Sequence, residues 1–190
     1  MRTNSLAVAV LLALSTSAFA THDARAQAQA AATPATFIGA MEIRTAVEQN
    51  NTGAFSDSPL RVVAIEPRYN VGVAVVRRNK IDGRMLPDAL SHDDVTEVYQ
   101  IIEGEGTLIT GGVLQSPKPM TAAAVIGEIG PSSAGQFIVG GTARRVAPGD
   151  IVIIPPHTAH GFVDIATSRI VYTIIRIDPH NVLELINTRH

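Results

Sequence analysis

The sequence predicts an all-β protein, a small antiparallel β-barrel or jelly roll, with minor helices near its N- and C-terminal ends. Three observations favour this class. Apolar, β-branched runs recur at nearly regular spacing between residues 60 and 178, and proline, glycine or asparagine bounds most of them. Few segments have the apolar period of a helix. Many short strands separated by turn residues are typical of a sandwich or a barrel.

The expected strands follow one another along the chain, each rich in residues that favour strands. Their segments are LRVVAIEP, YNVGVAVVRRN, TEVYQIIEG, GTLITGG, GQFIVGG, GDIVIIPP, HGFVDI and SRIVYTIIRID. Gly104-Glu105-Gly106 lies between the third and the fourth segment and predicts a hairpin there. Helix is expected only at residues 40–50 and in the C-terminal segment PHNVLELIN. Residues 113–135 are rich in proline, serine and alanine and predict a long loop, which either covers the mouth of the barrel or runs over its surface.

Residues 1–20 predict a secretory signal peptide. They combine a basic start, an apolar stretch and the small-residue end Ala18-Phe19-Ala20. The apolar stretch is shorter than the roughly 20 residues that a membrane-spanning helix needs. Cleavage after Ala20, or at the second site Ala24-Arg25-Ala26, would give an exported protein, secreted or periplasmic. Residues 21–36 are expected to form a disordered spacer and residues 37–190 a single domain.

Charge and cysteine content exclude several classes of function. The formal net charge of −2 gives no electrostatic case for nucleic acid or an anionic membrane surface, because both need clustered positive charge. The chain contains no cysteine, so thiolate metal sites and cysteine nucleophiles are excluded. The expected partner is a small-molecule ligand or substrate, with no nucleic acid and, after signal cleavage, no membrane.

Two histidines and a glutamate at strand ends predict a metal site. In the strand that follows Val95, side chains alternate, so Glu97 and Tyr99 share one face. A carboxylate buried on that face without a partner would cost several kcal/mol, so an inward Glu97 needs a cation. His92 precedes this strand and His160 begins a later one. Two histidines and one carboxylate form a ligand set that leaves coordination positions open.

The same residues give the chain a resemblance to the cupins. Residues 90–104 match the later half of the first cupin motif, in the spacing of His92, Glu97 and the closing glycine. Residues 149–164 match the second motif up to His160. The resemblance implies a single small antiparallel barrel, often dimeric, with His92, Glu97 and His160 holding one divalent iron, manganese, nickel, copper or zinc ion inside. A homodimer is therefore expected.

The motifs also differ from the family pattern. Leu90 stands where the first motif has a further histidine, His157 where the second has a glycine, and Asp164 where it ends in asparagine. Leucine cannot ligate a metal, which leaves three hypotheses. Three protein ligands hold the ion, or His157 replaces the missing ligand, or the metal is absent, as it is in some cupins.

The resemblance implies an enzyme without choosing the reaction. It favours a metalloenzyme of the oxygenase, isomerase, decarboxylase or lyase type acting on a small organic molecule, and the alternative is a cupin that binds or stores a ligand without catalysis. Tyr99 is the candidate catalytic residue, and Tyr99, Phe162 and either Tyr172 or Arg176 are candidates to line the cavity. Arg176 is expected to point outward because arginine is rarely buried; an inward Arg176 would suggest a substrate with a carboxylate.

Overall fold

The computed structural model describes residues 34–49, 53–65, 67–80 and 89–187, so the predicted signal peptide lies outside it. From Thr36 onward these residues belong to one compact unit. None of their helices is long and apolar enough to cross a membrane.

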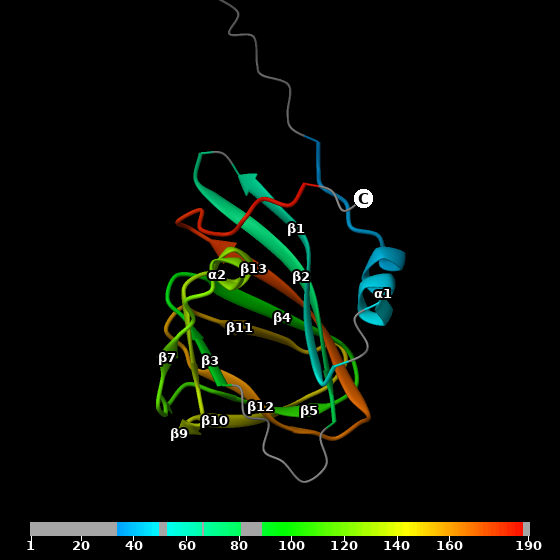
Figure 1. Ribbon diagram of the computed structural model, residues 1–190. Helices are drawn as coiled ribbons and strands as arrows, with labels where there is room; N and C mark the ends of the chain where they lie inside the picture. Colours follow the sequence, from blue (N-terminus) through cyan, green and yellow to red (C-terminus); the bar gives the residue numbers. More distant parts are fainter. Residues whose placement is uncertain (1–33, 50–52, 66, 81–88, 188–190) are drawn as a thin grey trace, which may run out of the picture. The chain divides into compact units, whose positions relative to one another are not determined.

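The described residues form two large antiparallel sheets (Figure 1). One sheet has the strand order β1-β2-β13-β4-β11, the other β10-β5-β12-β3-β8-β7, and β6 pairs with β9. The elements are α1 Ala40–Gln49, β1 Phe55–Ile65, β2 Tyr69–Asn79, β3 Ala89–His92, β4 Thr96–Glu103, β5 Gly106–Thr110, β6 Val113–Leu114, β7 Lys118–Pro119, α2 Ala123–Ile129, β8 Ser132–Gly135, β9 Ile138–Val139, β10 Thr142–Val146, β11 Ile151–Ile154, β12 His160–Ile165 and β13 Arg169–Asp178. The antiparallel barrel expected from the sequence, and implied by the cupin resemblance, is confirmed.

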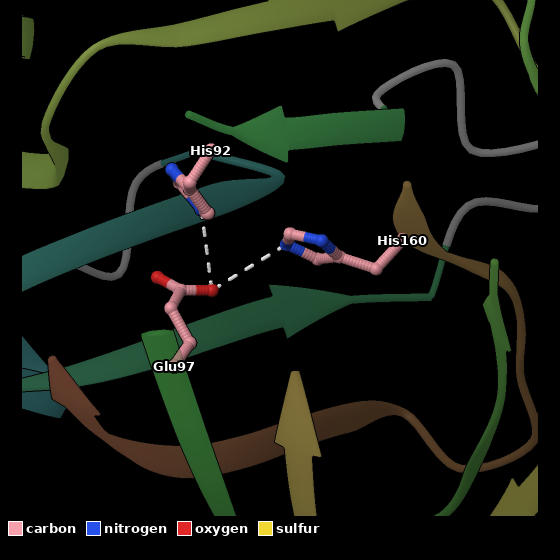
Figure 2. A group of neighbouring side chains, drawn as sticks. All are labelled: His92, Glu97 and His160. Atoms are coloured by element: carbon pink, nitrogen blue, oxygen red, sulfur yellow. Dashed lines mark ion pairs between the residues drawn. The ribbon is translucent and has the colours of Figure 1, made fainter. Parts of the chain in front are cut away.

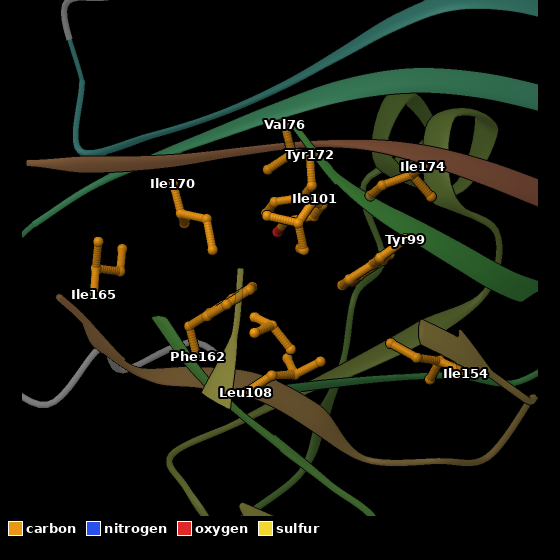
Figure 3. Close-up of a cluster of buried hydrophobic side chains, with 11 residues drawn as sticks. Val76, Tyr99, Ile101, Leu108, Ile154, Phe162, Ile165, Ile170, Tyr172 and Ile174 are labelled. Atoms are coloured by element: carbon orange, nitrogen blue, oxygen red, sulfur yellow. The ribbon is translucent and has the colours of Figure 1, made fainter. Parts of the chain in front are cut away.

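The hydrophobic core lies between the facing sheets (Figure 3). The alternation predicted for β4 holds, since Tyr99 and Ile101 are buried while Gln100 and Ile102 are exposed. Both sheets contribute to the core cluster, whose buried members are Val76, Tyr99, Ile101, Leu108, Val146, Ile154, Phe162, Ile165, Ile170, Tyr172 and Ile174. The inward face of β4 therefore passes from this core to Glu97 at its N-terminal end.

Helix α1 covers part of the outer face of the five-stranded sheet, where a helix was expected (Figure 1). Its residues Ala46 and Val47 pack with Leu60, Val75 and Val171 in a second buried cluster. The apolar side of α1 thus removes from solvent an outer face of β1, β2 and β13 that β-branched residues would otherwise expose.

The predicted hairpin at Gly104-Glu105-Gly106 is wrong. Strand β4 pairs with β11 and β13, whereas β5 pairs with β10 and β12, so the chain passes from one sheet to the other at this point. Gly104 has a φ of +75°, and a Cβ there would lie 2.0 Å from the carbonyl oxygen of Arg169. The glycines do mark a tight turn, but a turn signal does not say whether the flanking strands pair with each other.

The long loop predicted at residues 113–135 is also wrong as a description of the backbone. The segment forms β6, β7, α2 and β8, and β8 pairs with β3 in the six-stranded sheet. Its residues Met120, Val125 and Ile129 line the cavity described below. Of the two placements predicted for residues 113–135, the structure shows the first, in which the segment covers the mouth of the barrel.

The prediction of a helix in the C-terminal segment is wrong as well. Residues 179–187 contain no helix, and Asn181 has a φ of +56°. The backbone N–H of Leu183 donates to the carboxylate of Asp178 at 2.8 Å, and a backbone bridge joins Ile186 to Val62. Because these tertiary contacts satisfy the backbone, they override the helical spacing of the apolar residues.

Candidate metal centre

Three buried side chains from separate strands meet inside the barrel (Figure 2). His92 ends β3, Glu97 lies near the start of β4 and His160 begins β12. One potential ligand atom from each lies within 4.8 Å of the other two. The Nε2 atoms of His92 and His160 are 3.3 and 3.4 Å from Glu97 Oε2. The structure therefore brings together the three residues that the sequence indicated.

The two sheets share this cluster. β3 and β12 are neighbours in the six-stranded sheet, and β4 belongs to the five-stranded sheet. His92 and Glu97 are close in the sequence, but the bend at residues 93–95 carries the chain across the barrel between them. The histidines consequently face the glutamate across the interior, so a shared ion would connect the two sheets.

Hydrogen bonds fix which ring nitrogen of each histidine carries a proton. The Ser132 hydroxyl donates to the carbonyl oxygen of Gly130 at 2.8 Å, so it accepts at its 2.7 Å contact with His92 Nδ1. His160 Nδ1 lies 2.9 Å from the carbonyl oxygen of Thr158, which can only accept. Both Nδ1 atoms therefore donate, and in a neutral imidazole this leaves a lone pair on each Nε2.

Those Nε2 atoms have no hydrogen-bond partner within the part of the chain that the structure describes. Both rings are buried, and both Nε2 atoms face the same oxygen of Glu97. Two lone pairs directed at a carboxylate oxygen repel one another unless a proton or a metal ion lies among them. Two imidazole nitrogens and one carboxylate oxygen suit a divalent transition metal, so the residues present fit the ion that the cupin resemblance implies.

Glu97 is held as a carboxylate. Burial alone would raise its pKa, but His92, His160 and the guanidinium of Arg176 outweigh burial and hold the pKa well below its ordinary value. Arg176 Nε donates to Oε1 at 3.0 Å, and the Tyr99 hydroxyl donates to Oε2 at 2.9 Å. Oε1 is thus engaged by Arg176, while Oε2 faces the histidines.

Tyr99, the candidate catalytic residue, is a neutral phenol at the edge of this cluster. Burial, followed by the negative charge of Glu97, raises its pKa well above the ordinary value. Its ring meets that of His160 edge-on, with centroids 6.1 Å apart, and lies 4.6 Å from that of Tyr172. At neutral pH the hydroxyl is therefore a hydrogen-bond donor in a fixed position.

Arg176 points inward, against the expectation. It is 3% exposed, and Asp57 and Glu97 both accept hydrogen bonds from it. Two carboxylates of the chain itself therefore compensate this guanidinium, so its burial no longer indicates a carboxylate on the substrate.

A cavity of about 360 Å³ opens beside the cluster, and its walls are mostly apolar. It is lined by Phe55, Asp57, Val76, Arg78, Leu90, His92, Glu97, Tyr99, Met120, Val125, Glu128, Ile129, Ala134, Tyr172, Ile174 and Arg176. Of the residues predicted to line it, Tyr99, Tyr172 and Arg176 do so, whereas Phe162 lies in the core next to Tyr172 and does not. Leu90 presents an apolar surface next to His92 where the family pattern has a ligand.

His157 does not join the cluster. Its side chain is exposed, its φ is +61°, and its backbone N–H donates to the carbonyl oxygen of His92. The hypothesis that His157 replaces the missing ligand is therefore wrong in this structure. Asp94, in the bend after His92, pairs with His180 at the surface.

Comparison with known proteins yields matches in structure alone. No protein-family model and no curated protein matches the sequence. The structure of KdgF from Halomonas sp. is 17% identical and is matched over 70% of this chain and 87% of that one, with a TM-score of 0.40. An uncharacterised protein with a double-stranded β-helix domain from Klebsiella pneumoniae is 15% identical over 83% of this chain and 100% of that one, with a TM-score of 0.44. The DMSP lyase DddQ from Ruegeria pomeroyi is 16% identical over 67% of this chain and 48% of that one, with a TM-score of 0.40. Likeness at this level says nothing about a shared substrate.

Proposed function

We propose that this chain binds one divalent metal ion through His92, Glu97 and His160 and acts as a metalloenzyme on a small organic molecule. The observation that carries the proposal is the pair of buried imidazole Nε2 atoms that face one carboxylate oxygen and have no hydrogen-bond partner among the described residues. Iron, manganese, nickel, copper and zinc all accept this ligand set. When bound, the ion would supply a Lewis acid for an oxygen of the substrate, which suits an isomerase, a decarboxylase or a lyase, and its open coordination positions would suit an oxygenase.

The chain's own residues would bind and orient the substrate. The apolar wall that includes Leu90, Met120 and Ile129 suits a molecule with a largely apolar body and excludes water around it. The Tyr99 hydroxyl, kept protonated by its raised pKa, donates its one proton to Glu97 Oε2 and would hold that carboxylate in place, while its oxygen could accept a hydrogen bond from a polar group of the substrate. With leucine at position 90, the space beside His92 is open to the substrate.

Metal content tests the proposal directly. The purified protein should contain about one divalent ion per chain, and the content should fall sharply in His160→Ala and Glu97→Gln because each removes a ligand. His157→Ala is the matched control, since it removes an exposed histidine near His160 and should retain the metal. Elemental analysis of the four proteins measures this, and full occupancy in both ligand variants would end the proposal.

Turnover separates the enzyme from the alternative, a binding or storage protein. The mostly apolar cavity could hold a ligand without changing it. Phenols, organic acids and sugars incubated with the metal-loaded protein should show product for at least one class, with no product from Glu97→Gln. A metal-loaded protein that binds these ligands and converts none favours the alternative.

Export and the homodimer remain proposals. The N-terminal signal of residues 1–20 supports secretion or a periplasmic location after cleavage near Ala20. The edge strand β11 exposes Ile151 and Ile153 by 64% and 67%, an apolar strand edge of the kind that a second copy covers.

A further inference from the structure

A second charged group lies behind the proposed ligands. Arg176 donates through Nε to Glu97 Oε1, and both of its terminal nitrogens donate to the carboxylate of Asp57. Nη1 also donates to the carbonyl oxygen of Glu128 at 3.3 Å. The side chain of Arg176 is 3% exposed and that of Asp57 15%. One buried guanidinium therefore lies between two carboxylates, of which only Glu97 faces the histidines.

The fold positions this group specifically. Arg176 lies opposite Glu97 in the pairing of β13 with β4, and opposite Gly72 in the pairing with β2. A Cβ at Gly72 would lie 3.3 Å from the Cβ of Arg176, so glycine leaves room for the arginine stem. Asp57, from β1, lines the same cavity and meets the guanidinium from the other side.

The charges indicate what Asp57 does. Burial lowers the pKa of Arg176, but Asp57 and Glu97 outweigh burial and raise it, so the guanidinium stays charged. Within this hydrogen-bonded group, Arg176 and Glu97 together have no net charge, and imidazoles that bind the ion as neutral ligands add none. A dication would then enter a neutral site next to a buried positive charge, which is unfavourable at short range in a medium of low dielectric constant. The Asp57 carboxylate restores one negative charge.

We propose that Asp57 sets the metal affinity of the centre by compensating the charge of Arg176, from the far side of the guanidinium. In the same arrangement Arg176 acts through its charge: its Nε occupies Oε1 of Glu97, and Oε2 faces the histidines. This inference rests on the proposed metal centre.

The test is the equilibrium affinity for Zn²⁺, measured by competition with a chromophoric chelator at fixed pH and salt. Asp57→Asn should bind Zn²⁺ about 10–100-fold more weakly, the usual effect of losing a group that supports a ligand. Asp57→Glu keeps the charge and should stay much closer to the wild-type protein. The double variant Asp57→Asn/Arg176→Met removes both charges and should recover most of the lost affinity, because the site regains the single negative charge of Glu97.

Glu42→Gln is the matched control. It breaks the ion pair of Glu42 with Arg61, 2.5 Å in length, between α1 and the outer face of the same sheet, and should leave the Zn²⁺ affinity unchanged. A purely structural Asp57 would lower the free energy of unfolding in Asp57→Asn and leave the affinity at the wild-type value, which would overturn the inference. A double variant as weak as Asp57→Asn would overturn it too.

Two further outcomes can be told apart: a variant that does not fold, and a wild-type protein that binds no Zn²⁺. If Asp57→Asn does not fold, the double variant decides, since it replaces a buried ion pair by neutral groups, a change that proteins often tolerate. A Zn²⁺ affinity of the double variant within a few-fold of the wild-type value then supports the inference, and a large loss of affinity contradicts the inference. If the wild-type protein itself binds no Zn²⁺, the metal centre fails as a whole; if wild type and Asp57→Asn bind equally, the centre stands and only the role of Asp57 fails.

Discussion

Tyr172 shows how burial of a single residue changes the pH dependence of the protein. The residue is 1% exposed, and its hydroxyl accepts a hydrogen bond from Arg78 Nε at 2.9 Å. Burial raises the pKa of this phenol, and the Arg78 guanidinium offsets only part of that rise. The folded-state pKa lies above the unfolded-state value of about 10. The contribution of the protonated Tyr172 to the free energy of unfolding is therefore fully present below about pH 10, and it is lost as the pH rises through the folded-state pKa.

Tyr172→Phe should therefore be less sensitive to alkali. At pH 7 we expect it to lose about 1–2 kcal/mol in the free energy of unfolding, because the hydrogen bond from Arg78 is gone. Above about pH 10 its stability should fall less steeply than that of the wild-type protein, since one buried phenol no longer ionises on unfolding. Denaturant titrations at several alkaline pH values measure both effects, with the half-buried Tyr69→Phe as control. Parallel pH profiles for wild type and Tyr172→Phe would contradict the argument.

Single residues also mark how far the site could be predicted from sequence. Glu97 was identified because a carboxylate on a buried strand face demands a cation, and that argument needs only alternation. Alternation does not say which face of β13 is inward. Because arginine is rarely buried, the sequence predicts that Arg176 points outward. Asp57 and Ser132 were missed because their partners, Arg176 and His92, are 119 and 40 residues away in the sequence. No local pattern records such pairs.

At the scale of elements, the crossing between β4 and β5 takes the chain from the five-stranded to the six-stranded sheet, and Gly104 makes that crossing tight. Gly104 and Gly111 both have a φ of +75°, but a Cβ at Gly104 would clash with the backbone of Arg169, whereas a Cβ at Gly111 would meet nothing within 4 Å. The two glycines thus separate the cost of a left-handed backbone from the cost of the clash.

Gly111→Ala should cost about 1–2 kcal/mol in the free energy of unfolding, the penalty for a side chain in the left-handed region. Gly104→Ala should cost about 1–3 kcal/mol more, because the backbone must shift to relieve the overlap. Chemical denaturation of the two variants beside the wild-type protein measures the difference. Equal losses would mean that the crossing has room for a side chain and that its geometry is not set by Gly104.

For the whole molecule, the predictable part was the architecture and the unpredictable part was the allocation of strands to sheets. Strand-forming runs bounded by turn residues predict an antiparallel barrel wherever each run pairs. Which runs pair depends on contacts between distant segments, so the glycines after β4 predict a hairpin although β4 and β5 do not pair. The same contacts replaced the C-terminal helix by chain held at Asp178 and Val62. They also placed α2 at the barrel mouth.

A bound ion should stabilise the entire unit, because its ligands come from both sheets. Anything that binds only the folded state adds about 2.7 kcal/mol to the free energy of unfolding at a free concentration of 100 times its Kd. For a unit of this size that corresponds to a rise of about 5–10 °C in Tm. The metal-free protein should show this rise when the divalent ion found by elemental analysis is added, and Glu97→Gln should show none. His157→Ala should respond like the wild-type protein, since its exposed imidazole lies outside the cluster. A rise of the same size in Glu97→Gln would locate the stabilising ion elsewhere and would contradict a centre shared by the two sheets.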